Sequence, residues 1–300
     1  MKYLCIYHGN CADGFSAAWV VRKALGEENV EFYSGVYQQL PPDVNGRNVI
    51  IVDFSYKRAV IEAMRQSAES ILILDHHKTA KEDLEGYIGT TMETGAAPIE
   101  VVFDMERSGA MITWDYFFPT TLPPRLLMHV QDRDLWLFSL PHTREIQANL
   151  FSYPYDFTVW DDLMDRFGRD GDFAISFIAE GQAIERKHHK DINEYMKAAA
   201  TRALIAGHDV PVLNAPYFWS SDAGHIMAQG EKFAACYWDT PKGRVYSLRS
   251  TKEGMDVSQI AKLFGGGGHH NAAGFTVPCP PYNPVAVAPS AVRGPDRSTA

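Results

Sequence analysis

The chain has 300 residues, which is enough for two domains that each bury a core. Its composition, 46% hydrophobic and 22% charged, is that of an ordinary globular protein. No apolar run approaches the roughly 20 residues that span a bilayer, and His8 interrupts the short apolar start, so we expect a cytoplasmic protein with no membrane partner. The formal net charge of -9 argues against a long basic track for duplex DNA but allows a local cationic pocket.

The first 75 residues alternate between strand and helix patterns. Strands are predicted at 2–7, 30–35, 48–54 and 70–75, and helices at 14–25, ended by Gly26, and at 57–68. Four consecutive aliphatic residues at 71–74 need burial on both faces, as in a central parallel strand. The fold class predicted for this half is therefore α/β, a mostly parallel sheet flanked by helices.

The middle of the chain is predicted to be largely helical. A helix is expected from Thr94, a suitable N-cap, to Gly109 as its stop. Within 124–138 a second, apolar helix is predicted, and Asp132 and Asp134 come just after it. The long polar-faced segment 171–203 predicts a connecting helix.

From about residue 202 the pattern changes to shorter strands and helices, which predict a smaller α/β domain. Residues 278–300 hold 6 of the 17 prolines and lack periodicity, so we expect a disordered tail there. The predicted division is a first domain at 1–150, a helical linker at 151–201 and a second domain at 202–277.

Polar side chains stand at the ends of three predicted strands. His8, Asp53 and Asp75 follow strands, and His76 and His77 come directly after Asp75. Open α/β sheets place ligands at the carboxyl ends of their strands. Because these groups would be costly to bury unpaired, we expect them to line a cleft.

These strand ends supply candidate ligands for metal ions. The candidates are His8, Asp13, Asp53, Asp75, His76, His77 and Asp132. Carboxylates with imidazoles suit Mn, Fe, Zn or Mg. Two ions roughly 3.5–4 Å apart could share a carboxylate and a hydroxide that attacks phosphorus in line. The plainer alternatives are that Asp13 caps a helix and that Asp53 is a turn residue.

The glycine-rich run FGGGGHHNAAGF, residues 264–275, is the second feature. Its glycines permit positive φ and the close approach of backbone N–H groups to an anion, an arrangement called a nest. His269, His270 and Asn271 add donors, and Arg249 upstream could hold a phosphate through two hydrogen bonds. The plainer alternatives are a flexible loop and a surface ion pair.

In this order the motifs resemble those of the DHH phosphoesterase superfamily with a DHH-associated C-terminal domain, which includes RecJ-type exonucleases, nano-RNases and exopolyphosphatase-like proteins. LDHHKTA resembles the naming motif, YHGNCADGFSAA the first, IVDFS the second, VQDRDLW the fourth, and SLRS with FGGGGHHNAAGF the substrate motif. The resemblance spans residues 8–275 and implies an active site between two domains, with Mn ions held by the first.

The resemblance also implies metal-binding roles. His8 would bind one ion and Asp13 the other, Asp53 would bridge them, and His76 and Asp132 would complete the second site.

For catalysis and substrate binding, the resemblance implies that Asp75 orients the imidazoles and that His77 contacts the reacting phosphate or donates a proton, beside Asp53. The implied substrate-binding residues are Arg249, Gly266, Gly267, Gly268, His269 and, as a further donor, His270.

One position departs from the family pattern. The usual first motif has an Asp where Cys11 stands, directly after Asn10. Either residue, or a water, could replace the missing carboxylate. A neutral Asn10 would weaken that metal site, whereas a Cys11 thiolate would shift its preference toward Zn or Fe.

These observations predict a Mn-dependent phosphodiesterase that hydrolyses short single-stranded oligonucleotides or dinucleotides to mononucleotides, with two metal ions activating a bridging water. Mg, Fe and Zn are the alternative metals, and a homodimer is one expected state. The alternative functions are an exopolyphosphatase, a cyclic-nucleotide phosphodiesterase and a catalytically weakened nucleotide-binding protein.

Overall fold

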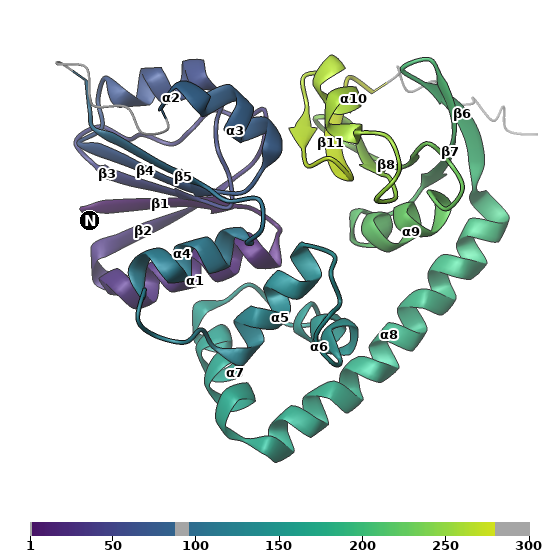
Figure 1. Ribbon diagram of the computed structural model, residues 1–300, viewed down its shortest axis with the longest axis horizontal. Helices are drawn as coiled ribbons and strands as arrows, with labels where there is room; N and C mark the ends of the chain where they lie inside the picture. Colours follow the sequence, from purple (N-terminus) through teal and green to yellow (C-terminus); the bar gives the residue numbers. More distant parts are fainter. Residues whose placement is uncertain (1, 88–95, 280–300) are drawn as a thin grey trace, which may run out of the picture.

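The computed structural model describes residues 2–87 and 96–279. Its first sheet contains β1 (Tyr3–His8), β2 (Val30–Gly35), β3 (Asn48–Val52), β4 (Ser70–Asp75) and β5 (Ile99–Phe103). The strand order is β2-β1-β3-β4-β5, and every neighbouring pair is parallel (Figure 1). The carboxyl ends of these strands therefore meet at one edge.

Helices cover both faces of this sheet. α1 (Ala12–Leu25) and α4 (Gly109–Phe117) lie on one face, and α2 (Arg58–Arg65) and α3 (Lys78–Leu84) on the other (Figure 1). In β4 the side chains of Ile71 and Ile73 enter the core under α2, whereas Leu72 and Leu74 enter the core under α1. Burial on both faces is what the aliphatic run predicts.

The helix predicted from Thr94 to Gly109 is wrong. Residues 99–103 form the edge strand β5, which pairs in parallel with β4, and Thr94 lies outside the described residues. Gly109 is the first residue of α4 and not the end of a helix; Ser108 caps α4 by accepting a hydrogen bond from the Met111 amide. The sequence IEVVF is rich in β-branched residues, and pairing with β4 decides in favour of a strand.

Four further helices follow: α5 (Arg125–Asp134), α6 (Thr143–Leu150), α7 (Phe157–Arg169) and α8 (Gly171–Ala199). The 29-residue α8 confirms the predicted connecting helix and runs diagonally to the second domain (Figure 1). Trp160 and Phe167 of α7 and Phe177 of α8 pack into the core beneath α1. That core thus extends into the segment predicted as linker.

The second domain is built on a mixed sheet of β6 (Thr201–Ile205), β7 (His208–Asn214), β8 (Ala234–Thr240), β9 (Gly243–Arg249), β10 (Gly267–Gly268) and β11 (Ala272–Val277). Its order is β10-β11-β9-β8-β7-β6, in which only the pair β7 and β8 is parallel within the described chain. The helices α9 (Ser220–Met227), preceded by the short η3 (Tyr217–Trp219), and α10 (Val257–Leu263) pack against it. The predicted fold class is confirmed.

The glycine-rich segment and α10 of the second domain contact the first domain at α3. Lys78 pairs with Asp256, and Lys262 pairs with Glu82. Across residues 2–87 and 96–279, no helix is both long enough and apolar enough to cross a membrane. The predicted tail lies outside the described residues except for 278 and 279.

Candidate metal centre

Asp53 is the centre of a polar cluster at the carboxyl edge of the first sheet. One of its oxygens, Oδ1, lies 3.0 Å from His76 Nε2, and the other, Oδ2, lies 3.4 Å from His8 Nδ1. Its side chain is buried, and its φ of 52° is in the left-handed region. Backbone strain of this kind persists only where the surroundings fix the residue, so Asp53 is more than a turn residue.

Asp75 positions the two histidines that follow it. Its Oδ1 accepts hydrogen bonds from His77 Nδ1 at 2.7 Å and from the backbone amides of His76 and His77 at 2.7 and 3.2 Å. With Nδ1 of His77 donating to Asp75, the opposite nitrogen of the ring is free to act in the cleft. The geometry fits the orienting role predicted for Asp75.

Asp13 does not cap its own helix. The N-cap residue of α1 is Cys11, which makes no side-chain capping bond, whereas the Asp13 carboxylate accepts from the Ala110 amide at the start of α4. Burial, together with the neighbouring Asp53 and Asp134 carboxylates, raises the pKa of Asp13 well above its usual value. Three carboxylates thus meet in a buried space.

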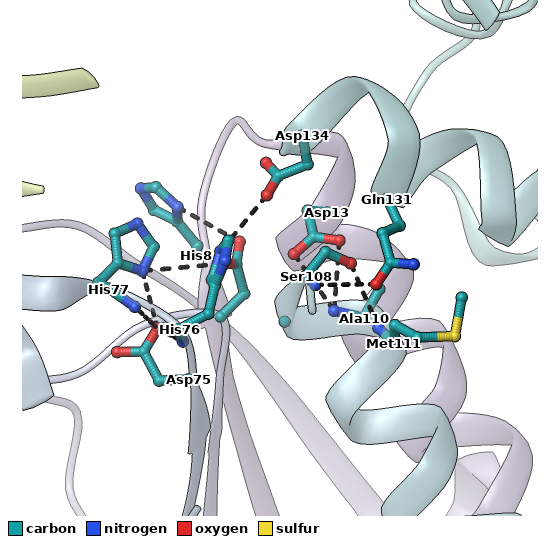
Figure 2. A network of polar contacts seen from close by, with 12 residues as sticks. His8, Asp13, Asp75, His76, His77, Ser108, Ala110, Met111, Gln131 and Asp134 are labelled. Atoms are coloured by element: carbon teal, nitrogen blue, oxygen red, sulfur yellow. Dashed lines mark hydrogen bonds and ion pairs between the residues drawn. The ribbon is translucent and has the colours of Figure 1, made fainter. Parts of the chain in front are cut away.

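The structure places Asp134, and not Asp132, in this cluster. Asp134 Oδ2 lies 3.4 Å from His76 Nε2, and its ligand atoms group with those of Asp13 and His76 (Figure 2). The carboxylate of Asp132 points away and accepts from Ser139 and Thr143. Residues two apart on a helix differ by about 200° in direction, so only one of the two could face the sheet edge, and the choice of Asp132 is corrected.

The structure also separates the two residues at the atypical position of the first motif. The sulfur of Cys11 and the ligand atoms of His8 and Asp53 all lie within 4.8 Å of one another. Asn10 is exposed and has a left-handed φ of 55°. Cys11 therefore occupies the place of the missing carboxylate more closely than Asn10.

Gly109 allows α4 to approach this cluster. A Cβ atom on Gly109 would lie 2.4 Å from the Cβ of Asp53, which is closer than real Cβ contacts. The absence of a side chain lets the start of α4 reach both Asp53 and Asp13. The predicted role of Gly109, a helix stop, gave no hint of this contact.

The glycine-rich loop closes over the histidines from the second domain. The ring of His269 lies 4.4 Å from His77 and 4.6 Å from His76, measured between centroids. The amide of Gly268 donates to Thr79 Oγ1 at 3.0 Å, and a Cβ on Gly267 would lie 2.6 Å from that oxygen.

Two expectations about this loop need correction. Gly267 and Gly268 form the short strand β10 and dock on α3, so they are not an open nest of free amides. His270 is exposed, and among the described residues its one hydrogen bond is accepted by its backbone oxygen from the Val257 amide. His269 alone of the two histidines joins the cluster.

Arg249 lies on β9 and faces α9. Its guanidinium donates to Ser247, to the Leu248 oxygen and to Ser221 at 2.8–3.0 Å. Burial and the nearby Arg133 lower its pKa to about 10, and within the described chain no carboxylate forms an ion pair with it. Arg249 is thus held by hydrogen bonds and not by the surface ion pair considered from the sequence.

The residues of the cluster fit divalent metal ions. Several buried atoms have no hydrogen-bond partner among the described residues: His8 Nδ1, Asp53 Oδ2, Asp75 Oδ2 and His76 Nδ1. Burial opposes ionisation of Asp53, but His76 and His8 outweigh it and hold its pKa well below the usual value. Bound cations would satisfy the free ligand atoms and relieve the repulsion among the three carboxylates.

A parallel sheet with histidines and carboxylates at its carboxyl edge, joined to a second domain with a mixed sheet, defines the class of DHH-domain folds, and the chain has this fold. It matches the solved DHH domain of PF0399, described as a member of a family of ribosomal proteins, over 92% of this chain and 82% of that chain, with a TM-score of 0.54 and 11% identity. The resemblance inferred from the motifs is therefore confirmed at the level of the fold.

Among curated proteins, the chain is 31% identical over 293 residues to the uncharacterized protein R106 of Acanthamoeba polyphaga mimivirus, covering 90% of this chain and spanning 66% of that protein. RecJ of Thermus thermophilus, solved with Mn2+, has a TM-score of 0.47 and 14% identity over 92% of this chain and 49% of that chain. No family model matches the chain.

Proposed function

We propose that the protein is a metal-dependent phosphodiesterase that hydrolyses short single-stranded oligonucleotides or dinucleotides to mononucleotides. The observation that carries this proposal is the group of Asp13, Asp53 and Asp134 beside His8 and His76, in which several buried ligand atoms have no hydrogen-bond partner among the described residues. Divalent ions bound there, with Mn as our first choice, would neutralise charge on the phosphoryl group and activate a water nucleophile.

Two sets of side chains would hold the ions. His8, Cys11 and Asp53 form one set, and Asp13, His76 and Asp134 form the other. Asp53 also contacts His76, so it lies between the two sets and suits a bridging role. The Cys11 thiol would favour a softer metal in the first set than the carboxylate that it replaces.

The chain's own groups would position the substrate. His77 holds a proton on Nδ1 against Asp75, which leaves the other ring nitrogen to contact the reacting phosphate. Arg249 would bind a more remote phosphate with the guanidinium donors that its serine contacts leave free. His269 covers the cluster from the second domain and would limit the entry of bulk water.

The test is hydrolysis of a panel by the full chain, with added Mn and with chelator: a dinucleotide, a five-nucleotide single strand, a cyclic dinucleotide and polyphosphate. We expect Mn-dependent release of mononucleotides. Losing a residue that merely supports a metal ligand lowers metal affinity or activity about 10–100-fold. Asp53 would bind the metal directly, so Asp53→Asn should reduce the rate of hydrolysis by at least about 100-fold. Asp172→Asn, at an exposed position of α8, is the matched control and should not change it.

Each other outcome points elsewhere. Unchanged hydrolysis in Asp53→Asn would contradict the site assignment. Phosphate release from polyphosphate alone would favour an exopolyphosphatase, and cleavage of only the cyclic dinucleotide a cyclic-nucleotide phosphodiesterase. Metal binding without any turnover would favour a nucleotide-binding protein weakened at Cys11. A cytoplasmic location and a homodimer stay predictions from the sequence.

A further inference from the structure

A cavity with a mostly apolar lining lies next to the last turn of α5. It has a volume of about 270 Å³ and lies among α5, α6, α8 and the segment from η3 to α9. Its lining includes two cations, Arg133 and Arg144, the rings of Phe138, Phe151 and Phe218, and the carboxylates of Glu185 and Asp222. None of these residues belongs to the candidate metal centre, but Arg133 directly precedes Asp134 at the end of α5. The last turn of α5 thus contributes a residue to both the cavity and the candidate metal centre.

The guanidinium of Arg133 has no hydrogen bond or ion pair among the described residues, although the carboxylates of Asp222 and Asp134 are close enough to interact with its charge. It lies 4.3 Å from the ring of Trp136 and 5.8 Å from that of Phe151. A guanidinium has five N–H donors, and no nitrogen of Arg133 is among the buried side-chain atoms that lack a partner, so these donors reach solvent-accessible space. These donors are therefore available to an anionic ligand in the cavity.

Arg144 adds a second cation next to an aromatic face. Its guanidinium lies 3.6 Å from the ring centroid of Phe138 and 3.6 Å from the carboxylate of Asp222. Phe218 lines the same cavity and is 61% exposed, so core packing does not account for it. The cavity combines guanidinium donors with accessible aromatic rings.

The loop that contributes Phe138 to the cavity lining is strained. Between α5 and α6, Trp136, Phe138 and His142 have φ values of 57°, 48° and 66°. The carboxylate of Asp132 holds the loop by accepting from the amides of residues 139 and 140 and from two hydroxyl groups. Left-handed conformations of bulky residues cost about 1–3 kcal/mol each and cluster at ligand-binding places.

We propose that this cavity binds one nucleotide unit of the substrate, with Arg133 holding its phosphate and Phe218 or a neighbouring ring stacking on its base. The inference rests on the proposed function and deepens it, because it names a nucleotide and not a bare phosphate chain as the ligand. Base stacking on aromatic side chains contributes about 1–3 kcal/mol and tolerates any sequence. The cavity, about 270 Å³, is slightly smaller than the roughly 300 Å³ at which known ligand pockets begin, so it has room for one nucleotide unit at most.

Helix α9 of the second domain lies next to both the cavity, through Asp222, and Arg249, through Ser221. Trp136 stacks on His225 of α9 at 3.9 Å between centroids, and Arg249 donates to Ser221 of the same helix. Arg133 and Arg249 are close enough for the charge of Arg133 to lower the pKa of Arg249. A dinucleotide whose scissile bond lies at the metal centre could therefore contact Arg249 and, at its second nucleotide, Arg133.

The experiment measures calorimetric binding of 5′-AMP and of inorganic pyrophosphate to the full chain in chelator, so that neither metal nor turnover contributes. We expect 5′-AMP to bind, Arg133→Gln to weaken it at least about 10-fold, and Phe218→Ala to weaken 5′-AMP but not pyrophosphate. Arg169→Gln, which alters an exposed arginine of α7, is the control and should bind as wild type.

Equal 5′-AMP affinity in wild type, Arg133→Gln and Phe218→Ala would overturn the inference, as would no binding to wild type at millimolar 5′-AMP. If Arg133→Gln fails to fold, Phe218→Ala decides, because its exposed ring contributes little to the core. The proposed function fails by a different result, unchanged hydrolysis in Asp53→Asn. Hydrolysis can thus survive when the cavity assignment does not.

Discussion

Asp132 and Asp134 are two nearby carboxylates on α5 that make different contacts. The carboxylate of Asp132 accepts hydrogen bonds from the loop between α5 and α6 and from Thr143 at the start of α6. These contacts outweigh the burial that opposes its ionisation and lower its pKa. Asp134 has no such donors, lies among other carboxylates, and has its pKa raised by burial above all. We therefore expect Asp132 to contribute to stability and Asp134 to contribute to metal binding.

We predict opposite phenotypes for the two alanine variants. Asp134→Ala should lower metal affinity and Mn-dependent hydrolysis at least about 100-fold while leaving stability nearly unchanged, because it removes a carboxylate from a repulsive group. Asp132→Ala leaves buried donors unpaired and should lower the free energy of unfolding by about 1–3 kcal/mol. Metal titration and urea unfolding measure the two effects. The reverse pattern would restore Asp132 as the ligand.

The start of α4 is the element that shapes the metal centre. Ser108 caps this helix, Ala110 donates its amide to Asp13, and Gly109 lies against Asp53. The positive end of the helix dipole thus points toward two carboxylates, which opposes the rise in the pKa of Asp13 that burial causes. This close approach depends on a position without a side chain.

Gly109→Ala should therefore disturb the metal centre. The added Cβ would meet the Cβ of Asp53 at 2.4 Å and force α4 or the end of β3 to move. We expect stability to fall by about 1–3 kcal/mol, as for an overpacked core, and metal affinity to fall with it. Thermal unfolding with and without Mn measures both.

Gly168→Ala is the matched control for that variant. Gly168 lies in α7, and a Cβ there would meet nothing within 4 Å. Replacing a helical glycine by alanine should raise stability by about 0.5–1 kcal/mol. If both variants behaved alike, tight packing at Gly109 would not be the cause.

At the scale of the whole molecule, Asp222 ties the second domain to the first. From α9 it pairs with His188 of α8 at 3.0 Å and with Arg144 of α6 at 3.6 Å. Burial opposes its ionisation, but His188 and Arg133 outweigh burial and lower its pKa to about 2. The charged form of Asp222 is therefore the form that the folded protein favours.

This shift predicts a pH dependence of stability. Because the folded pKa is depressed, the contribution of Asp222 is present above its ordinary pKa of 3.8 and is lost as the pH falls toward about 2. A shift of this size corresponds to about 2 kcal/mol. Urea unfolding should show Asp222→Asn less stable than wild type at pH 6, with the gap closing below pH 3. A gap that stayed constant with pH would contradict the assignment, and Asp172→Asn should follow wild type throughout.

The sequence by itself determined the parallel sheet and the place of the site. Aliphatic strands such as 71–74 must be buried on both faces, and parallel strands bring their carboxyl ends to one edge, so His8, Asp53 and His76 had to converge. The same reasoning separated the second domain and its glycine-rich loop, since local pattern and turn chemistry carry that information.

Only the tertiary structure decided which neighbouring groups share that edge. The helical register of α5 selected Asp134, pairing with β4 made residues 99–103 a strand, and docking on α3 closed the loop, in which β10 pairs with β11, so that it is not an open nest. The open donors of Arg133 likewise exist because α6, α8 and α9 surround it without supplying, among the described residues, a carboxylate within ion-pair distance. Each of these outcomes depends on contacts between residues far apart in the chain, and no local pattern in the sequence encodes them.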